Sequence, residues 1–281
     1  MTMSAARIQG FRRELLAVLA VLGVLAGCRG GFREDPILAL GAEESLAQGK
    51  VLMERTKYAE ARRYLLHAFE VEPNSVQGRE ALLLAADSFF LDGSTQNWIQ
   101  AEAKYRDFQN RFPTSDRAAY VQFQIARSLA ARMERPDRDQ STATKAVKAF
   151  EDLVRLFPTS EYAAKSEGEI RRLRDNLAEH EYRVAVFYYR YGIPVATVSR
   201  LEGVLSQYPD FSEMDKVLFR LGQGYLRTGR LVEAHLTFER LTRDYATSRY
   251  ASQIPALPPL PAPPTPPTQS TSPAAAESGS R

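Results

Sequence analysis

The sequence predicts an all-α fold, an α-solenoid of about five helix pairs that ends in a disordered proline-rich C-terminal tail. Two features of the 281 residues predict it. Five segments carry one pattern, in which small, apolar or aromatic residues at positions i, i+4 and i+7 precede a helix-ending position five residues later. Beyond residue 254 the composition changes, since nine of the sixteen prolines lie between positions 255 and 273.

Residues 1–27 form a predicted secretory signal peptide. Three arginines lie within the first thirteen residues, and an uninterrupted segment of apolar and small residues follows from 15 to 27. A basic region, a short apolar region and small residues in that order are typical of such a leader. As a helix, this segment would measure roughly 20 Å, well short of the about 30 Å hydrocarbon core of a bilayer. We therefore expect a cleaved leader and not a membrane-spanning helix.

The only cysteine of the chain, Cys28, follows this segment directly. The sequence LAGC that it ends resembles the lipobox of bacterial lipoproteins, which implies that Cys28 becomes the lipid-bearing first residue of the mature protein. Two or more acyl chains hold a soluble domain stably at a membrane. Residues 28–40 would then be a lipidated tether, and Arg29, in place of an aspartate, implies an outer-membrane location. The alternative is an ordinary signal peptide followed by a free cysteine.

The charge of the chain gives no sign of a nucleic-acid partner. Removal of residues 1–27 takes away three arginines and one glutamate, so 34 of the 37 basic and 33 of the 34 acidic residues remain. A nucleic-acid-binding domain normally carries a marked excess of basic residues. We therefore expect the chain not to bind nucleic acid.

The repeats occupy residues 41–250. Positions i, i+4 and i+7 lie on one face of a helix and a proline ends it, so each copy predicts the second helix of a helix pair. The copies are Ala61, Leu65, Ala68 and Pro73; Ala101, Tyr105, Phe108 and Pro113; Ala146, Phe150, Leu153 and Pro158; Thr197, Leu201, Val204 and Pro209; and Ala234, Phe238, Leu241 and Ala246. The pattern resembles the tetratricopeptide repeat. The region 251–281 cannot form a packed element and should bury little apolar surface.

The fourth repeat is longer than the others and predicts a long first helix from about residue 161 to 191. This helix carries the aromatic sequence EYRVAVFYYRY at 181–191. Its apolar residues form two stripes, Tyr182, Val186 and Tyr189, and Val184, Tyr188 and Tyr191. Two stripes favour a helix that packs against neighbours on both sides, and a ligand-binding platform is the alternative.

The sequence contains no complete catalytic motif. His180 and Glu181 begin like the zinc-protease pattern HExxH, but Val184 occupies the second histidine position. The segment Gly222-Gln223-Gly224 lacks the third glycine of a dinucleotide site and lies in a helical pattern. We therefore expect no enzymatic activity, no catalytic residue, no metal and no cofactor beyond the covalent lipid on Cys28.

Residues 137–210 resemble the corresponding part of the BamD-type lipoproteins of the outer-membrane β-barrel assembly machinery. The similar elements are an Asp-Arg-Asp loop, LVRLFPTSEY, EYRVAVFYYRYG and RLEGVLSQYPD, in the family's order and spacing. The lipobox and the five repeats agree with it, whereas the first two repeats match only at general repeat positions. The proline-rich tail lies outside the family pattern.

The resemblance implies a non-enzymatic scaffold, anchored by lipid to the outer membrane and facing the periplasm. It implies binding to the barrel-forming assembly protein through the C-terminal repeats, to accessory lipoproteins, and to unfolded outer-membrane proteins near the N-terminal repeats. The alternative function is a tetratricopeptide lipoprotein of the cell envelope that organises peptidoglycan-associated or division proteins.

One helix face in the fourth repeat is a candidate partner site. A helix beginning near Pro194 is expected to bury Val195, Val198, Leu201 and Leu205. The opposite face then carries Ala196, Arg200, Gly203 and Gln207. A solvated arginine is one interpretation, but Gly203 favours another, because a glycine inside a helix costs about 1 kcal/mol relative to alanine. The family resemblance implies that the arginine of the RxEGxL segment, here Arg200, contacts the barrel-forming partner.

Overall fold

The computed structural model describes residues 35–260, and within that range every regular element is helical. The predicted signal peptide, Cys28 and most of the tether lie outside the described residues. The chain divides into two compact units, Met1–Asp92 and Gly93–Arg281. Within residues 35–260, no helix combines the length and the apolar character that crossing a membrane requires.

In the first unit, the helix α3 packs against each of the other three elements. These elements are η1 (Pro36–Ala39), α2 (Ala42–Glu54), α3 (Tyr58–Val71) and α4 (Val76–Asp92). A small core lies between α2, α3 and α4, with Leu46, Leu65 and Ala81 fully or almost fully buried.

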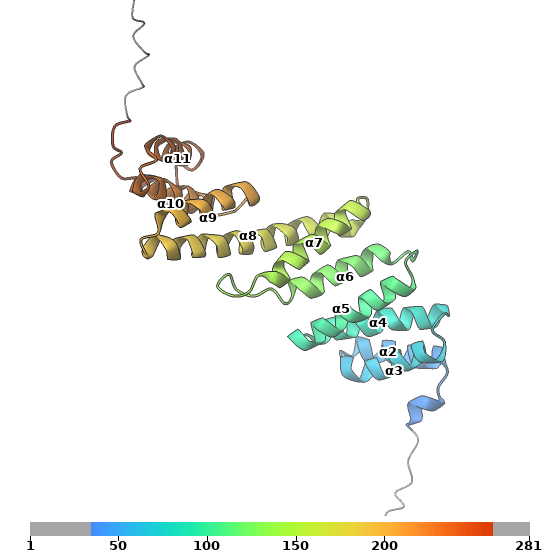
Figure 1. Cartoon of the computed structure of the whole chain (residues 1–281). Helices are drawn as coiled ribbons and strands as arrows, with labels where there is room; N and C mark the ends of the chain where they lie inside the picture. The colour runs from blue at the N-terminus through green and yellow to red at the C-terminus, as the bar shows by residue number, and fades with distance from the viewer. Residues whose placement is uncertain (1–34, 261–281) are drawn as a thin grey trace, which may run out of the picture. The chain divides into compact units, whose positions relative to one another are not determined.

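In the second unit, each long helix packs against the next one along the chain (Figure 1). The elements are α5 (Thr95–Arg111), α6 (Ala118–Ala130), α7 (Ser141–Leu156), α8 (Glu161–Arg190), α9 (Pro194–Gln207), α10 (Met214–Arg227), α11 (Leu231–Asp244) and η2 (Ala251–Gln253). The order of helices confirms the all-α prediction.

The five repeat segments form α3, α5, α7, α9 and α11. Four of these helices pack against the helix that precedes them, in the pairs α2 with α3, α6 with α7, α8 with α9, and α10 with α11. The helices α4 and α5 belong to different units. All fifteen positions at i, i+4 and i+7 are at most 3 % exposed. Each helix ends two residues before the proline, or before Ala246 in the last repeat. The spacing therefore identified the buried face and the end of each of these helices.

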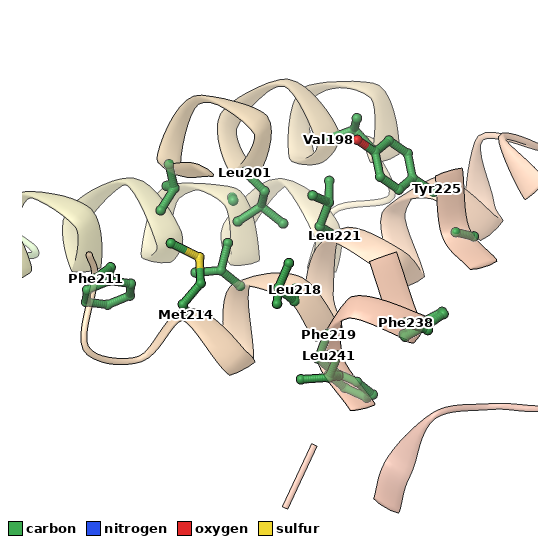
Figure 2. Close-up of a cluster of buried hydrophobic side chains, with 14 of the residues drawn as sticks. Val198, Leu201, Phe211, Met214, Leu218, Phe219, Leu221, Tyr225, Phe238 and Leu241 are labelled. Carbon is green, nitrogen blue, oxygen red and sulfur yellow. The ribbon is translucent and has the colours of Figure 1, made fainter. Parts of the chain in front are cut away.

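One continuous core joins α9, α10 and α11 with Ala178 and Ala185 of α8 (Figure 2). Two glycines of α10 let its neighbours approach closely. A Cβ at Gly222 would lie 2.5 Å from the Phe238 ring of α11, and one at Gly224 would lie 2.9 Å from Val198 of α9. The Gly222-Gln223-Gly224 segment thus serves helix packing.

The 30-residue helix α8 begins and ends where the sequence predicts. Ser160 caps its N-terminus, since its hydroxyl accepts a hydrogen bond from the Tyr162 N–H. At its C-terminus, Gly192 takes a φ of 73°, a left-handed conformation that glycine adopts without steric cost. The loop before α7 is fastened to α8 through His180, whose Nδ1 lies 2.6 Å from the carbonyl oxygen of Pro136.

The beginning of the proline-rich region packs against the second unit, which corrects the expected start of disorder at residue 251. Residues Ala251–Gln253 form η2, and Ile254 and Leu257 lie against the core of α9, α10 and α11. His235 Nε2 hydrogen-bonds the carbonyl oxygen of Pro258 at 2.8 Å. The apolar side chains of Ile254 and Leu257 explain the difference, because both are partly buried against this core.

We expect deletion of residues 254–281 to lower the free energy of unfolding by about 1–2 kcal/mol, because Ile254 and Leu257 are each partly buried. Deletion of residues 261–281 is the matched control, since it leaves both contacts in place. Thermal unfolding followed by circular dichroism compares the two truncations. Equal melting temperatures would show that residues 254–260 contribute no stability.

Candidate partner-binding face of α9

The helix α9 begins at Pro194, which occupies its first turn, and its buried face is centred on Leu201. The fully buried residues are Thr197, Leu201 and Val204, with Val198 at 4 % exposure. The expectation for Val195 was wrong, because its side chain is 71 % exposed, and Leu205 is only partly buried. At 100° per residue, Val195 lies 120° around the helix from Leu201, too far to reach the core.

The other face of α9 carries the three candidate residues together. Arg200 and Gln207 are exposed and Gly203 is partly exposed. Arg200 Nη1 forms an ion pair with Glu181 Oε2 of α8 at 2.9 Å. Further along, Arg174 of α8 donates to the backbone carbonyl of Gln207 at 2.8 Å. The face therefore includes both helices, and Arg200 lies beside a carboxylate of α8.

The negative charge of Glu181 also acts on Tyr208, the residue that follows α9. Burial raises the pKa of the Tyr208 hydroxyl, and the negative charge of Glu181 adds to the rise, while Arg174 opposes it. In this ion pair, the side chain of Arg200 is 48 % exposed and that of Glu181 is 29 % exposed. Exposed pairs of this kind contribute between about 0 and 1 kcal/mol of stability, so Arg200 remains available to a stronger acidic partner.

Among residues 35–260, nothing packs tightly against Gly203. A Cβ built there would meet only Gln207 Nε2, at 3.8 Å, an ordinary contact. This contrasts with Gly222 and Gly224, where a Cβ would collide with a neighbouring helix. Gly203 therefore leaves an open strip beside Arg200 that a partner's backbone could approach.

We expect Gly203→Ala to stabilise the isolated protein by about 0.5–1 kcal/mol, because alanine favours the helix and the site has room for it. Gly168→Ala in α8 should have the same effect, since a Cβ there meets nothing within 4 Å. Chemical denaturation of both variants measures the change. A destabilised Gly203→Ala protein, beside a stabilised Gly168→Ala protein, would show that Gly203 is needed for packing.

On the other side of α8, a buried lysine of α10 forms an ion pair with α8. Lys216 Nζ lies 2.6 Å from Glu179 and 2.7 Å from Glu213. Burial alone would lower the pKa of Lys216, but the hydrogen bonds to the two carboxylates outweigh it and raise the pKa. For Glu179, burial raises the pKa, and the hydrogen bonds from Lys216 and Arg183 more than reverse this, so its pKa is lowered. These charges hold the two helices together at neutral pH.

Across residues 35–260, no group of three or more histidine, cysteine, aspartate or glutamate side chains is arranged to hold a metal ion. His180 and His235 each hydrogen-bond a backbone carbonyl. His67 does the same in the first unit, with Nε2 3.1 Å from the carbonyl oxygen of Leu40. The histidines thus fasten loops to helices.

Comparison with known proteins identifies similar sequences over most of the chain. Residues 41–234 match the family YfiO, described as outer membrane lipoprotein. The outer membrane protein assembly factor BamD of Haemophilus influenzae is 29 % identical over 224 residues, covering 76 % of this chain and 84 % of that protein. The protein of the same description from Rickettsia prowazekii is 28 % identical over 240 residues, covering 85 % and 94 %. The one from Caulobacter vibrioides is 24 % identical, covering 80 % and 74 %.

Proposed function

The chain belongs to the YfiO family of outer membrane lipoproteins, and from this premise we propose that it is a periplasm-facing scaffold subunit of the β-barrel assembly complex. In this role it binds the barrel-forming assembly protein, together with accessory lipoproteins, and receives unfolded outer-membrane proteins. The similarity to three outer membrane protein assembly factors over at least three quarters of the chain carries the proposal.

The proposed anchor is a lipid on Cys28, which lies outside the described residues. The lipobox-like sequence before Cys28 supports it, as does the family description as lipoproteins. Within the proposed tether, Pro36–Ala39 form η1, which packs against α3, so residues 29–35 would connect the lipid to the first unit. A tether of this kind places the repeats next to the membrane without crossing it.

The proposed contact with the barrel-forming partner is the face formed by Arg200, Gly203 and Gln207. An arginine can form two parallel hydrogen bonds with a carboxylate, which gives the contact both strength and orientation. Gly203 supports the proposal, because its open strip would admit the partner's backbone. A methyl group at this position would occupy that strip, so Gly203→Ala should weaken the complex while Gly168→Ala should not.

The N-terminal repeats are proposed to receive unfolded outer-membrane proteins. Depletion of the chain in its native host tests the proposed function as a whole. We expect the folded, heat-modifiable forms of outer-membrane barrel proteins to decrease, while an unrelated outer-membrane lipoprotein keeps its level. Undiminished folded barrels after full depletion would contradict the assembly role.

A further inference from the structure

A hollow between the C-terminal end of α8 and the helix α10 combines basic and aromatic side chains. It is lined by three arginines, three aromatic residues and one valine, and by no carboxylate. We call it the arginine–aromatic hollow. Its arginines are Arg183, Arg190 and Arg220, and its aromatic residues are Tyr182, Phe187 and Tyr191.

The positive charge of the hollow is only partly neutralised within the chain. Arg183 pairs with Glu179 at 2.7 Å. Among residues 35–260, neither Arg190 nor Arg220 has a carboxylate within ion-pair distance. The guanidinium of Arg220 stacks on the ring of Tyr189 at 4.4 Å, and its Nε is buried with no hydrogen-bond partner in that range. Arg220 is partly buried, and its Nη1 donates a hydrogen bond to the neutral side chain of Gln223 at 2.8 Å. Its charge is therefore not balanced by a carboxylate within residues 35–260, so the hollow favours a negatively charged ligand.

The rim of the hollow is apolar and unusually exposed. Phe187 and Tyr191 lie with their ring centroids 4.4 Å apart and are 53 % and 70 % exposed. Ile193 and Val195, which follow in the chain, are 46 % and 71 % exposed. Four of the fourteen large hydrophobic side chains exposed within residues 35–260 thus lie within nine consecutive residues. Phe187 and Tyr191 line the hollow itself, and exposed apolar side chains beside a hollow are typical of a protein-binding site.

The hollow is separate from the candidate face of α9. Arg190 follows Glu181 by nine residues, which places it on the opposite side of α8 at 100° per residue. Arg200 pairs with Glu181, so the ion pair and the hollow face different directions. A ligand in the hollow would therefore leave the Arg200 face accessible.

We propose that the arginine–aromatic hollow binds an acidic segment of a partner protein. A carboxylate of the segment would lie against Arg190 and Arg220, and a neighbouring apolar side chain would pack on Phe187 and Tyr191. Arginine and aromatic residues are the side chains that most often dominate the binding energy of protein interfaces. The concave, arginine-lined shape favours an inserted side chain over a flat membrane surface.

The test uses the full-length protein in detergent and two labelled twelve-residue peptides as probes. One peptide alternates aspartate or glutamate with leucine or phenylalanine, and its twin carries asparagine and glutamine in place of the acids. We expect the acidic peptide to bind about tenfold or more tightly than its twin, and the difference to shrink as salt is raised from about 50 to 300 mM.

Substitutions locate the site. Arg190→Glu should abolish the preference for the acidic peptide, and Phe187→Ser should weaken the binding of both peptides. Arg172→Glu, in the first half of α8, is the matched control and should change the binding of neither peptide. Because Arg190 and Phe187 are exposed, the variants should keep the melting temperature of the parent protein.

Equal binding of the two peptides, or a preference that survives Arg190→Glu in a folded protein, would overturn the proposal. Competition by short-chain phosphatidylglycerol, but not by phosphatidylcholine, would assign the hollow to membrane lipid and would overturn it too.

Discussion

Replacing Arg200 with glutamate is expected to weaken the complex with the barrel-forming partner by about 2 kcal/mol or more, about thirtyfold in affinity. The substitution exchanges an attraction for a like-charge contact at the partner's carboxylate. In the isolated chain it places a second carboxylate beside Glu181, but that pair is half exposed, so helicity and melting temperature should change little. Titration of the purified protein with the partner's periplasmic fragment measures the loss.

The ion pair with Glu181 provides a control that separates two roles of Arg200. If Arg200 binds the partner, Glu181→Gln releases it from its internal competitor, and the complex should be unchanged or tighter. If Arg200 acts only by holding Glu181, then Glu181→Gln and Arg200→Gln should weaken the complex equally. If the folded Glu181→Gln and Arg200→Gln proteins lose the same affinity for the partner, a direct contact between Arg200 and the partner is contradicted.

Replacing Cys28 with serine is expected to abolish acylation and to move the protein from the membrane fraction to the soluble fraction. The physical reason is that two or more acyl chains anchor a protein stably, and serine cannot carry the thioether lipid. Cell fractionation measures the release from the membrane, and the mass of the purified protein measures the loss of the acyl chains. Sedimentation of an unlipidated Cys28→Ser protein with outer membranes, in cells that lack its partner, would contradict the lipid anchor.

The repeat helices could be predicted from the sequence because local spacing determines them. Ala234, Phe238 and Leu241 illustrate this, since the i, i+4, i+7 spacing alone placed them on one face and all three are buried. A proline, or a turn at the same position, ends each helix. The helix α8 followed from similar signals, a serine at its start and Gly192-Ile193-Pro194 at its end.

The features that the sequence did not predict depend on neighbouring helices. Val195 precedes Val198 by three residues, which is the spacing of one apolar helix face. Its side chain is nevertheless exposed, because it lies outside the face of α9 that packs against neighbouring helices. Glu181 was found beside Arg200 only in the structure, although α8 and α9 flank a short turn at Gly192 and must therefore run back along each other. In such a hairpin, residues at similar distances from the turn face each other, so the pattern places Glu181 within reach of Arg200.

The aromatic residues at 181–191 differ in how far neighbouring helices cover them. Tyr182 packs partly against the core and Tyr189 carries the stacked guanidinium of Arg220, whereas Phe187 and Tyr191 remain exposed. The helix α8 is 30 residues long, but its neighbours α7 and α9 have only 16 and 14. Which aromatic residues are covered therefore depends on where those shorter helices lie along α8, which helical periodicity does not encode.

The most direct measurement is purification of the tagged full-length chain from detergent-solubilised cell envelopes, followed by mass spectrometry of the proteins that accompany it. The proposed function predicts a large barrel protein with tandem periplasmic domains in stoichiometric amount, and Arg200→Glu should reduce its recovery. Recovery of peptidoglycan-associated or division proteins without such a barrel protein would contradict the assembly role.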